Sequence, residues 1–373
     1  MLRCSRREWL AGTAATTALL AAPRAARAAN ATRWTIEPSE AHDAIRLISY
    51  GGYPVGAGPL EKDAALSALA RSLPADAVKH VLGRFGYVFL DVFEPLLEAF
   101  DFARPRTLGD LRGAITVAAP HAPKWFAQSA GDLERIVDAL IAGGFSAYWR
   151  ENNLPRADAG AARLRLALGD ADPFTPASRI LGTPSGEDVT ILVQGYADRD
   201  WYWLAGRRFY VRADAKPADV LRYITDNLVR DGYPLRDDAE VNRAIDALAA
   251  DRFIAGTLKA RNSHHEYWAS PRSYVHGNCI SVLQQLAGGP PLRMYWRGVG
   301  INVFAEALYA VLVDERYTST AHGPFRATLL RLIGPDGPLA PGRVGPTYAR
   351  LIGAPPPPRW AGEPPLPDPA HPR

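Results

Sequence analysis

The sequence predicts a mainly helical α+β protein with a small antiparallel sheet, and two observations lead to this class. First, apolar residues recur with helical spacing through the first half of the chain, which predicts helices over 39–48, 62–73, 75–82 and 132–142. Second, β-branched and aromatic residues form two runs, Asp188–Tyr196 and Arg207–Ala213, on either side of a turn at Ala205-Gly206. Two such runs around a turn favour an antiparallel hairpin.

The second half of the chain adds more helical segments and little strand. A short helix headed by Cys279 should end at the Gly-Gly-Pro that follows it. The expected helices cover 217–232, 239–260, 279–286 and 301–313, with a strand at 292–296.

The first 28 residues have the order of an export signal. A basic start with Arg3, Arg6 and Arg7 precedes an apolar, alanine-rich run over 9–22, and a small-x-small cleavage site follows at 26–28. The paired arginines resemble a twin-arginine signal, which implies a bacterial protein that the twin-arginine translocase carries, folded, to the periplasm. Because the apolar run is too short to span a membrane well, we expect cleavage rather than anchoring.

Charge argues against one class of partner. The whole chain carries 43 basic and 39 acidic side chains, and segment 1–28 holds five arginines and one glutamate, so the remaining chain is balanced. A balanced chain without a basic block lacks the positive face that nucleic-acid binding requires. No other stretch is apolar over about eighteen residues, so we expect no transmembrane segment in the mature chain.

The mature chain should be organised around its own hydrophobic core. Residues 29–353 are long enough for one large domain, or for a helical subdomain at 29–180 and an α+β subdomain at 181–353. The proline-rich segment 354–373 should be a disordered tail. Once the signal is removed, Cys279 is the single cysteine, so no intrachain disulfide can form.

Cys279 is the first candidate for chemistry. A helix N-terminus lowers the pKa of a thiol and makes the thiolate nucleophile more available. Asn278 would cap that helix, and His276 lies three residues upstream. The alternative is a cysteine that packs in the core as a small hydrophobic residue.

Two segments resemble a known family. The sequence YVHGNCISVL at 274–283 resembles the Tyr-x-x-x-Asn-Cys-x-x-x-Leu signature on the nucleophile helix of circularly permuted papain-like proteins, which include NlpC/P60, lecithin:retinol acyltransferase-like and DUF4105-like groups. The sequence RFGYVFLDV at 84–92 resembles the strand that carries the histidine of those proteins, with Tyr87 in the histidine's place.

This resemblance implies a permuted papain-like fold and a cysteine-dependent reaction. The reaction would be acyl transfer or amide hydrolysis through a thioester on Cys279. Because Tyr87 removes the expected general base, another histidine would have to replace it, and His80 and His121 are the nearest to Tyr87 in sequence. Each match covers about ten residues.

Aromatic residues beside charged ones form the second candidate site. Such surfaces bind glycans or peptides by ring stacking with hydrogen bonds at the edge, although aromatic residues of a hairpin also fill protein cores. The candidate substrate-binding residues are Arg199, Trp201, Trp203, Tyr295 and Trp296.

A third cluster has residue types that suit a metal site, but its spacing does not support one. His264, His265 and Glu266 are metal-ligand types, yet their spacing matches no zinc signature. A metal site therefore ranks third among the interpretations and enters no predicted site, and we predict no cofactor.

The sequence leaves two functions from different classes. The first is an exported cysteine-dependent acyl transferase or amidase that acts on a cell-envelope substrate, and it requires a reactive thiol close to a histidine. The second is a non-catalytic periplasmic protein that binds an envelope small molecule, glycan or peptide through the aromatic residues. This second function predicts a buried, inert Cys279.

Overall fold

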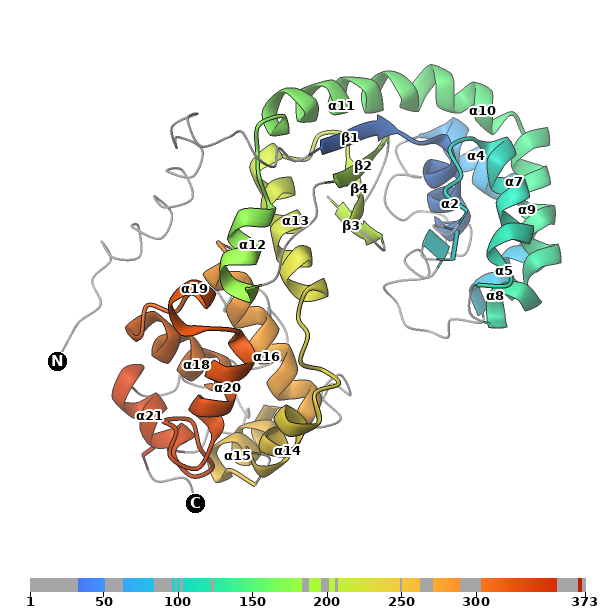
Figure 1. Cartoon of the computed structure of the whole chain (residues 1–373). Helices are drawn as coiled ribbons and strands as arrows, with labels where there is room; N and C mark the ends of the chain where they lie inside the picture. Colours follow the sequence, from blue (N-terminus) through green and yellow to red (C-terminus); the bar gives the residue numbers. More distant parts are fainter. Residues whose placement is uncertain are drawn as a thin grey trace. The chain divides into compact units, whose positions relative to one another are not determined.

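The sheet differs from the one that the sequence predicts. Three strands run parallel, β1 (Arg33–Pro38), β2 (Asp188–Gln194) and β4 (Arg208–Arg212), and β3 (Trp201–Leu204) joins β4 antiparallel at the edge (Figure 1). The predicted small antiparallel sheet is therefore wrong, and the papain-like architecture loses this support.

The computed structural model describes residues 33–50, 63–83, 96–97, 99–100, 103–121, 124–182, 188–195, 201–204, 207–248, 250–261, 271–288, 303–353 and 368–370.

The order and direction of the strands explain why the hairpin prediction failed. The segment between the two predicted strands contributes β3, so the chain reverses between β2 and β3 and again between β3 and β4. After two reversals β4 runs parallel to β2 and lies between β2 and β3, with Leu192 opposite Tyr210. The sequence analysis also missed β1, which pairs with β2 from a position far away in the sequence.

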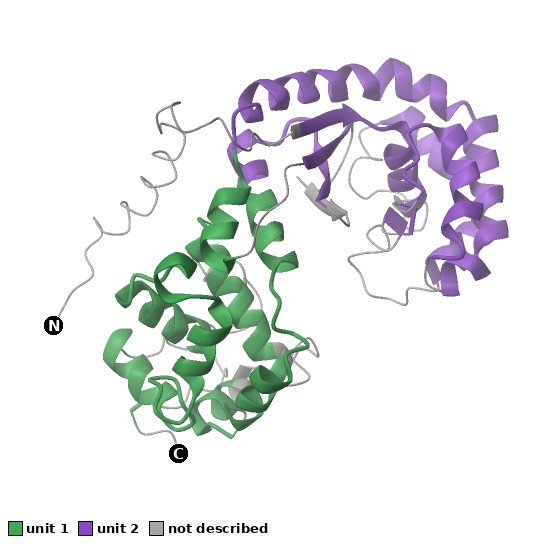
Figure 2. Ribbon diagram, viewed as in Figure 1, with its two compact units in different colours: residues 1–24, 172–186, 222–373 green, residues 25–171, 187–221 purple. Residues whose placement is uncertain are grey.

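The chain forms two compact units, each with its own core (Figure 2). Among the described residues, unit 2 comprises 33–171 and 188–221, and unit 1 comprises 172–182 and 222–370, with their gaps. The predicted subdomain boundary at residue 180 falls inside α12 (Phe174–Leu181), within unit 1.

Unit 2 places the sheet among helices. In a sheet, neighbouring strands point aligned side chains to the same face, so Glu37, Leu192 and Tyr210 share one face. Leu192 and Tyr210 pack into the core that the α2 side chains also join, while α11 packs along β1 and β2. The helices are α2 (Glu40–Tyr50), α4 (Ala64–Ser72), α5 (Ala75–Gly83), α7 (Leu108–Ala118), α8 (Lys124–Gln128), α9 (Ala130–Ala142), α10 (Phe145–Tyr148) and α11 (Leu154–Leu168).

Local sequence signals account for several of these helices. Thr107 and Asp110 form a reciprocal capping box that starts α7, and Asp63 accepts two backbone N–H groups at the start of α4. A π-helical turn, η3 (Trp149–Asn153), connects α10 to α11. The predicted helices at 39–48, 62–73, 75–82 and 132–142 are confirmed to within two residues at each end.

Unit 1 is helical and centres on α16 (Pro271–Leu286). Side chains from α16 and α18 (Val303–Asp314) form the middle of its core. Pro369, within the predicted tail, is buried, and its carbonyl lies close to Gly345. The other helices are α13 (Pro217–Asp231, shared with unit 2), α14 (Ala239–Leu248), α15 (Arg252–Arg261), α19 (Ser319–His322), α20 (Phe325–Ile333) and α21 (Val344–Leu351).

Candidate functional site

Cys279 does not head a helix. It lies in the interior of α16, which begins at Pro271, so the N-terminal dipole and free N–H groups do not act on the thiol. Asn278 is not a cap either, because its side-chain amide donates to the carbonyl of Tyr274 one turn back, at 2.6 Å. Cys279 is 0 % exposed in the core of unit 1, and this burial raises the pKa of the thiol to about 12. Such a thiol stays protonated at neutral pH.

A histidine does lie near this thiol, linked to it through a tyrosine. The Tyr233 hydroxyl lies 2.9 Å from Nδ1 of His276 and also forms a hydrogen bond with Cys279. On the other side of the ring, Nε2 of His276 lies 2.9 Å from the Asn242 side-chain oxygen. Both ring nitrogens are therefore occupied, and burial is the main cause that lowers the pKa of His276. The described structure joins Cys279 to His276 indirectly.

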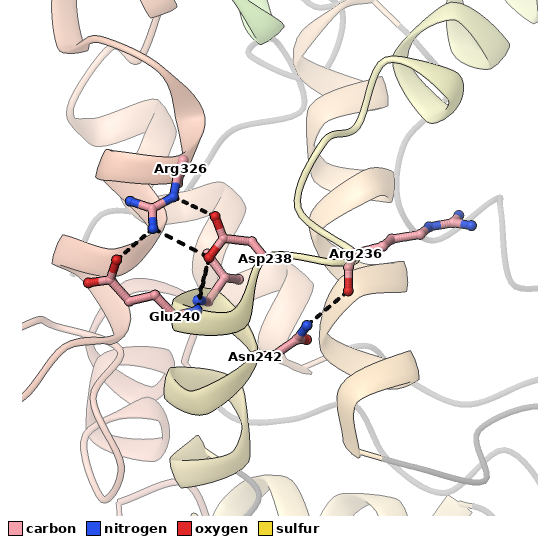
Figure 3. A network of polar contacts seen from close by, with 6 residues as sticks. Arg236, Asp238, Glu240, Asn242 and Arg326 are labelled. Atoms are coloured by element: carbon pink, nitrogen blue, oxygen red, sulfur yellow. Dashed lines mark hydrogen bonds and ion pairs between the residues drawn. The ribbon is translucent and has the colours of Figure 1, made fainter.

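This chain of contacts continues to the surface of unit 1 (Figure 3). The Asn242 amide donates to the carbonyl of Arg236 at 2.9 Å. Asp238 caps α14 through the backbone N–H groups of residues 240 and 241, and Arg326 from α20 donates to both Asp238 and Glu240. Since Arg326 and Glu240 are exposed and Asp238 is partly exposed, these ion pairs add little stability.

The other two predicted catalytic histidines lie in a different unit from Cys279. His80, on α5, is paired with Asp132 of α9, and His121 is an exposed residue after α7. Both belong to unit 2, whereas Cys279 belongs to unit 1. Tyr87, Arg199, His264, His265, Glu266, Tyr295 and Trp296 lie outside the described residues, as do the side chains of Trp201 and Trp203 on β3.

A second site emerges only from the structure of unit 2. The first turns of α2, directly after β1, carry a run of polar side chains that are almost completely buried. Buried polar and charged groups cost stability unless they are paired, so a run of them indicates either a structural network or a functional site. We call these side chains, together with the partly exposed Glu37 of β1 and with Arg208 and Tyr210 of β4, the polar layer; it comprises Glu37, Ser39, Glu40, His42, Asp43, Arg46, Arg208 and Tyr210.

Asp43 is the centre of the polar layer. Its Oδ2 accepts hydrogen bonds from Trp149 Nε1 at 2.8 Å, from the Gly195 backbone N–H at 3.2 Å and from Asn153 Nδ2 at 3.5 Å. Its Oδ1 accepts one from the Tyr210 hydroxyl. Burial raises the pKa of Asp43 to about 7, and the four donors only partly oppose this rise.

The π-helical turn aims two of these donors. Its two ends, Trp149 and Asn153, both point their side-chain N–H groups at Asp43. On the opposite side, Gly195 at the end of β2 comes so close to Asn153 that an added Cβ would lie 2.5 Å from the Asn153 Cβ. Short π-helices occur often at functional sites, and a glycine that permits such a close approach fits the same interpretation.

His42 differs from Asp43 because one of its polar atoms has no partner. Its Nδ1 lies 2.7 Å from the Ser39 hydroxyl, and its ring is tilted against the Tyr210 ring. Its Nε2 is buried without any hydrogen bond, as is Oε1 of Glu40. Burial, then Arg208 and Arg106, lower the pKa of His42 to about 3, so the ring is neutral.

The charged members of the polar layer contact neighbouring elements. Arg106 pairs with Glu37, and Glu37 also interacts electrostatically with Arg208. Glu40 accepts the backbone N–H of Leu108 at the start of α7. Burial lowers the pKa of the Arg208 guanidinium, which is the expected cost of desolvating a cation.

The polar layer lies where α/β sheets usually bind ligands. Ser39 directly follows the carboxyl end of β1, and Gly195 follows the carboxyl end of the neighbouring parallel strand β2. Ligands of open α/β sheets bind beyond these strand ends. The sequence analysis missed this site, although one signal was present: the run SEAHDAIR, dense in polar residues, begins a helix whose every described side chain is buried.

Comparisons with known proteins add no identification. No protein-family model, curated protein or solved structure matches this chain.

Within the described ranges, no group of three or more histidine, cysteine, aspartate or glutamate side chains could hold a metal ion. Among the helices that the structure describes, none is long and apolar enough to cross a membrane.

Proposed function

We propose that the protein is an exported, non-catalytic binding protein for a small envelope-derived molecule, held at the polar layer of unit 2. The single observation that carries this proposal is a set of buried polar atoms without hydrogen bonds, which includes His42 Nε2 and Glu40 Oε1. A buried polar group left unpaired costs about 1–3 kcal/mol, and a ligand that pairs with it recovers that cost. The position at the carboxyl ends of two parallel strands supports the same conclusion.

The state of Cys279 favours this class over an enzyme. A cysteine nucleophile must reach its substrate as a thiolate, whereas Cys279 is fully buried with its pKa raised to about 12. A buried and inert thiol is what the binding function predicts.

Native mass spectrometry of protein isolated from a periplasmic extract tests the proposal. We expect the wild-type protein to carry a small-molecule adduct that denaturation releases. The His42→Phe variant should lose it, because phenylalanine fills the ring's space without a polar atom. His80→Gln is the matched control, since His80 lies in the same unit but outside the polar layer. An adduct of equal occupancy in His42→Phe, or none in the wild type, would count against the site.

A cysteine-dependent acyl transferase or amidase is the second candidate. It is supported by the order of groups Cys279, Tyr233, His276 and Asn242, which resembles a nucleophile, a proton relay, a base and the residue that orients the base. For this chemistry α16 would have to move so that the thiol meets substrate. Turnover of amide or ester substrates that is lost in Cys279→Ser would support this candidate over the first.

A further inference from the structure

The Ser39 hydroxyl fixes which nitrogen of His42 carries the proton. This hydroxyl accepts the backbone N–H of His42 at 3.4 Å, and its oxygen lies 2.7 Å from Nδ1. Ser39 is 1 % exposed, so its own O–H also needs an acceptor, and Nδ1 supplies one. With Nδ1 accepting, the proton of the neutral ring resides on Nε2, whereas the reverse arrangement would leave both the Ser39 O–H and Nε2 unpaired. Nε2 of His42 is therefore a buried N–H donor that lacks an acceptor.

Glu40 has the complementary need, because one of its oxygens is an acceptor without a donor. Its Oε2 accepts the Leu108 N–H at the start of α7, and its Oε1 is buried without a hydrogen bond. The negative charge of Glu40 is already stabilised, since the residue lies in the first turn of α2 and contacts the first turn of α7, and helix N-termini favour a carboxylate. An uncharged donor is therefore enough for Oε1.

Both residues lie beside the segment that leads into α7. The Arg106 carbonyl accepts the backbone N–H of Ala41 at 3.2 Å, and Leu108 donates to Glu40. The Arg106 side chain also acts electrostatically on the His42 ring. Residues 106–108 therefore run along the first turn of α2, and this turn carries both the unpaired donor and the unpaired acceptor.

The other charged side chains of the polar layer have partners of their own. Glu37 pairs with Arg106, and Asp43 accepts four hydrogen bonds. Arg46 and Arg208 each have a further interaction as well. A charged ligand group would lose its hydration beside charges that already have partners, and this desolvation is costly. An uncharged ligand group avoids the cost.

A secondary amide is an uncharged group that satisfies both atoms. It brings one acceptor, its carbonyl oxygen, and one donor, its N–H, and these match His42 Nε2–H and Glu40 Oε1. Two neighbouring hydroxyl groups would bring a second donor that needs its own acceptor. A carboxylate or phosphate would bring charge and no N–H. Secondary amides occur in peptide bonds and in N-acetylated sugars, which are two sources of the same chemistry.

We infer that His42 Nε2–H and Glu40 Oε1 bind the carbonyl oxygen and the N–H of a secondary amide in the ligand. The inference rests on the proposed binding function and names the chemistry of the ligand at that site. It assigns Ser39 a positioning role, because the Ser39 hydroxyl holds the ring in the tautomer that donates from Nε2.

Matched probes test this inference by isothermal titration at neutral pH. The probes are N-acetylglucosamine, N-acetylalanine methylamide, glucose, which lacks the amide, and acetate, which carries a charge. The site variants are His42→Phe and Glu40→Gln. In Glu40→Gln the side-chain oxygen can still accept the Leu108 N–H, and the NH₂ group then replaces the acceptor Oε1. The matched control is Asp138→Asn, an exposed carboxylate of the same unit that pairs with Arg112.

We expect at least one amide probe to bind the wild type and Asp138→Asn at least about tenfold more tightly than glucose does, a difference of about 1.4 kcal/mol. The tighter of the two amide probes identifies the source, a peptide or an N-acetylated sugar. Both site variants should lose this preference for the amide. Circular dichroism confirms that each variant is folded, and either site variant suffices if the other unfolds.

The possible results separate the inference from the proposed function. If glucose and the amide probes bind equally, or if a ligand released from the native protein has no secondary amide, the inference fails while the binding function stands. Tighter binding of acetate than of either amide, with the same dependence on His42, would overturn the assignment of an uncharged group. A released ligand that contains a secondary amide, and that Glu40→Gln no longer retains, supports the inference even without probe binding. If no probe binds and no ligand is released from the native protein, both fail.

Discussion

His42 and Asp43 should give unit 2 opposite responses to pH, and replacing His42 by phenylalanine should reveal them. Burial raises the pKa of Asp43 from 3.8 to about 7, so between these values the folded state binds more protons than the unfolded state. Acidification through this window stabilises the fold, and the stability is lost as pH rises through 7. Burial and two arginines lower the pKa of His42 from 6.5 to about 3, so there the unfolded state binds more protons, and acidification destabilises the fold.

The two effects are similar in size. One pKa unit corresponds to 1.36 kcal/mol, so the full contributions are about 4 kcal/mol for Asp43 and about 5 kcal/mol for His42. Between about pH 4 and pH 6.5 the contributions of Asp43 and His42 to the pH dependence of the free energy of unfolding cancel in the wild type. His42→Phe removes the contribution of His42 and leaves that of Asp43. The free energy of unfolding of the variant minus that of the wild type should therefore increase by about 3 kcal/mol from pH 6.5 to pH 4.

Urea unfolding followed by circular dichroism at several pH values measures this difference. Comparing variant with wild type at each pH cancels the contributions of other titrating groups. Asp43→Asn is the complementary variant, and its stability should fall on acidification more steeply than that of the wild type. A difference between His42→Phe and wild type that is constant from pH 4 to pH 6.5 would show that His42 titrates normally and would refute the reasoning.

Three further predictions concern packing and the thiol. Gly195→Ala should destabilise unit 2 by about 1–3 kcal/mol in urea unfolding because its Cβ meets Asn153, whereas Gly131→Ala, in an open helical position, should be neutral or stabilising. Equal effects of the two substitutions would contradict the close approach. Cys279 should resist iodoacetamide in the folded protein up to pH 9 and react only after unfolding; fast labelling at neutral pH would instead support the cysteine enzyme. Tyr233→Phe should cost about 1–3 kcal/mol, since it removes a buried hydroxyl shared by a histidine and the thiol, and an unchanged urea midpoint would argue against that contact.

Local patterns placed some of the helices and missed others. Helical periodicity and proline positions depend on neighbouring residues, so four helices of the first half, α2, α4, α5 and α9, were predicted almost to their ends, whereas α7, α8, α10, α11 and α12 were not predicted. The start of α16 could not be predicted from the sequence. This helix is buried on nearly all sides and mixes His276, Asn278 and Ser281 with apolar residues. Without an amphipathic stripe, periodicity does not show where such a helix begins.

Strand direction and the polar layer depended on the tertiary structure. The sequence by itself determined the helical class, the balanced charge beyond segment 1–28 and the presence of one cysteine outside that segment. It could not set the direction of β4, because parallel pairing joins strands through contacts distant in sequence, and it could not show that Cys279 is buried. Asp43 became a candidate functional residue only when η3, β2 and β4 brought Trp149, Gly195 and Tyr210 to it. A pKa depends on burial and on neighbours in space, and only folding determines both.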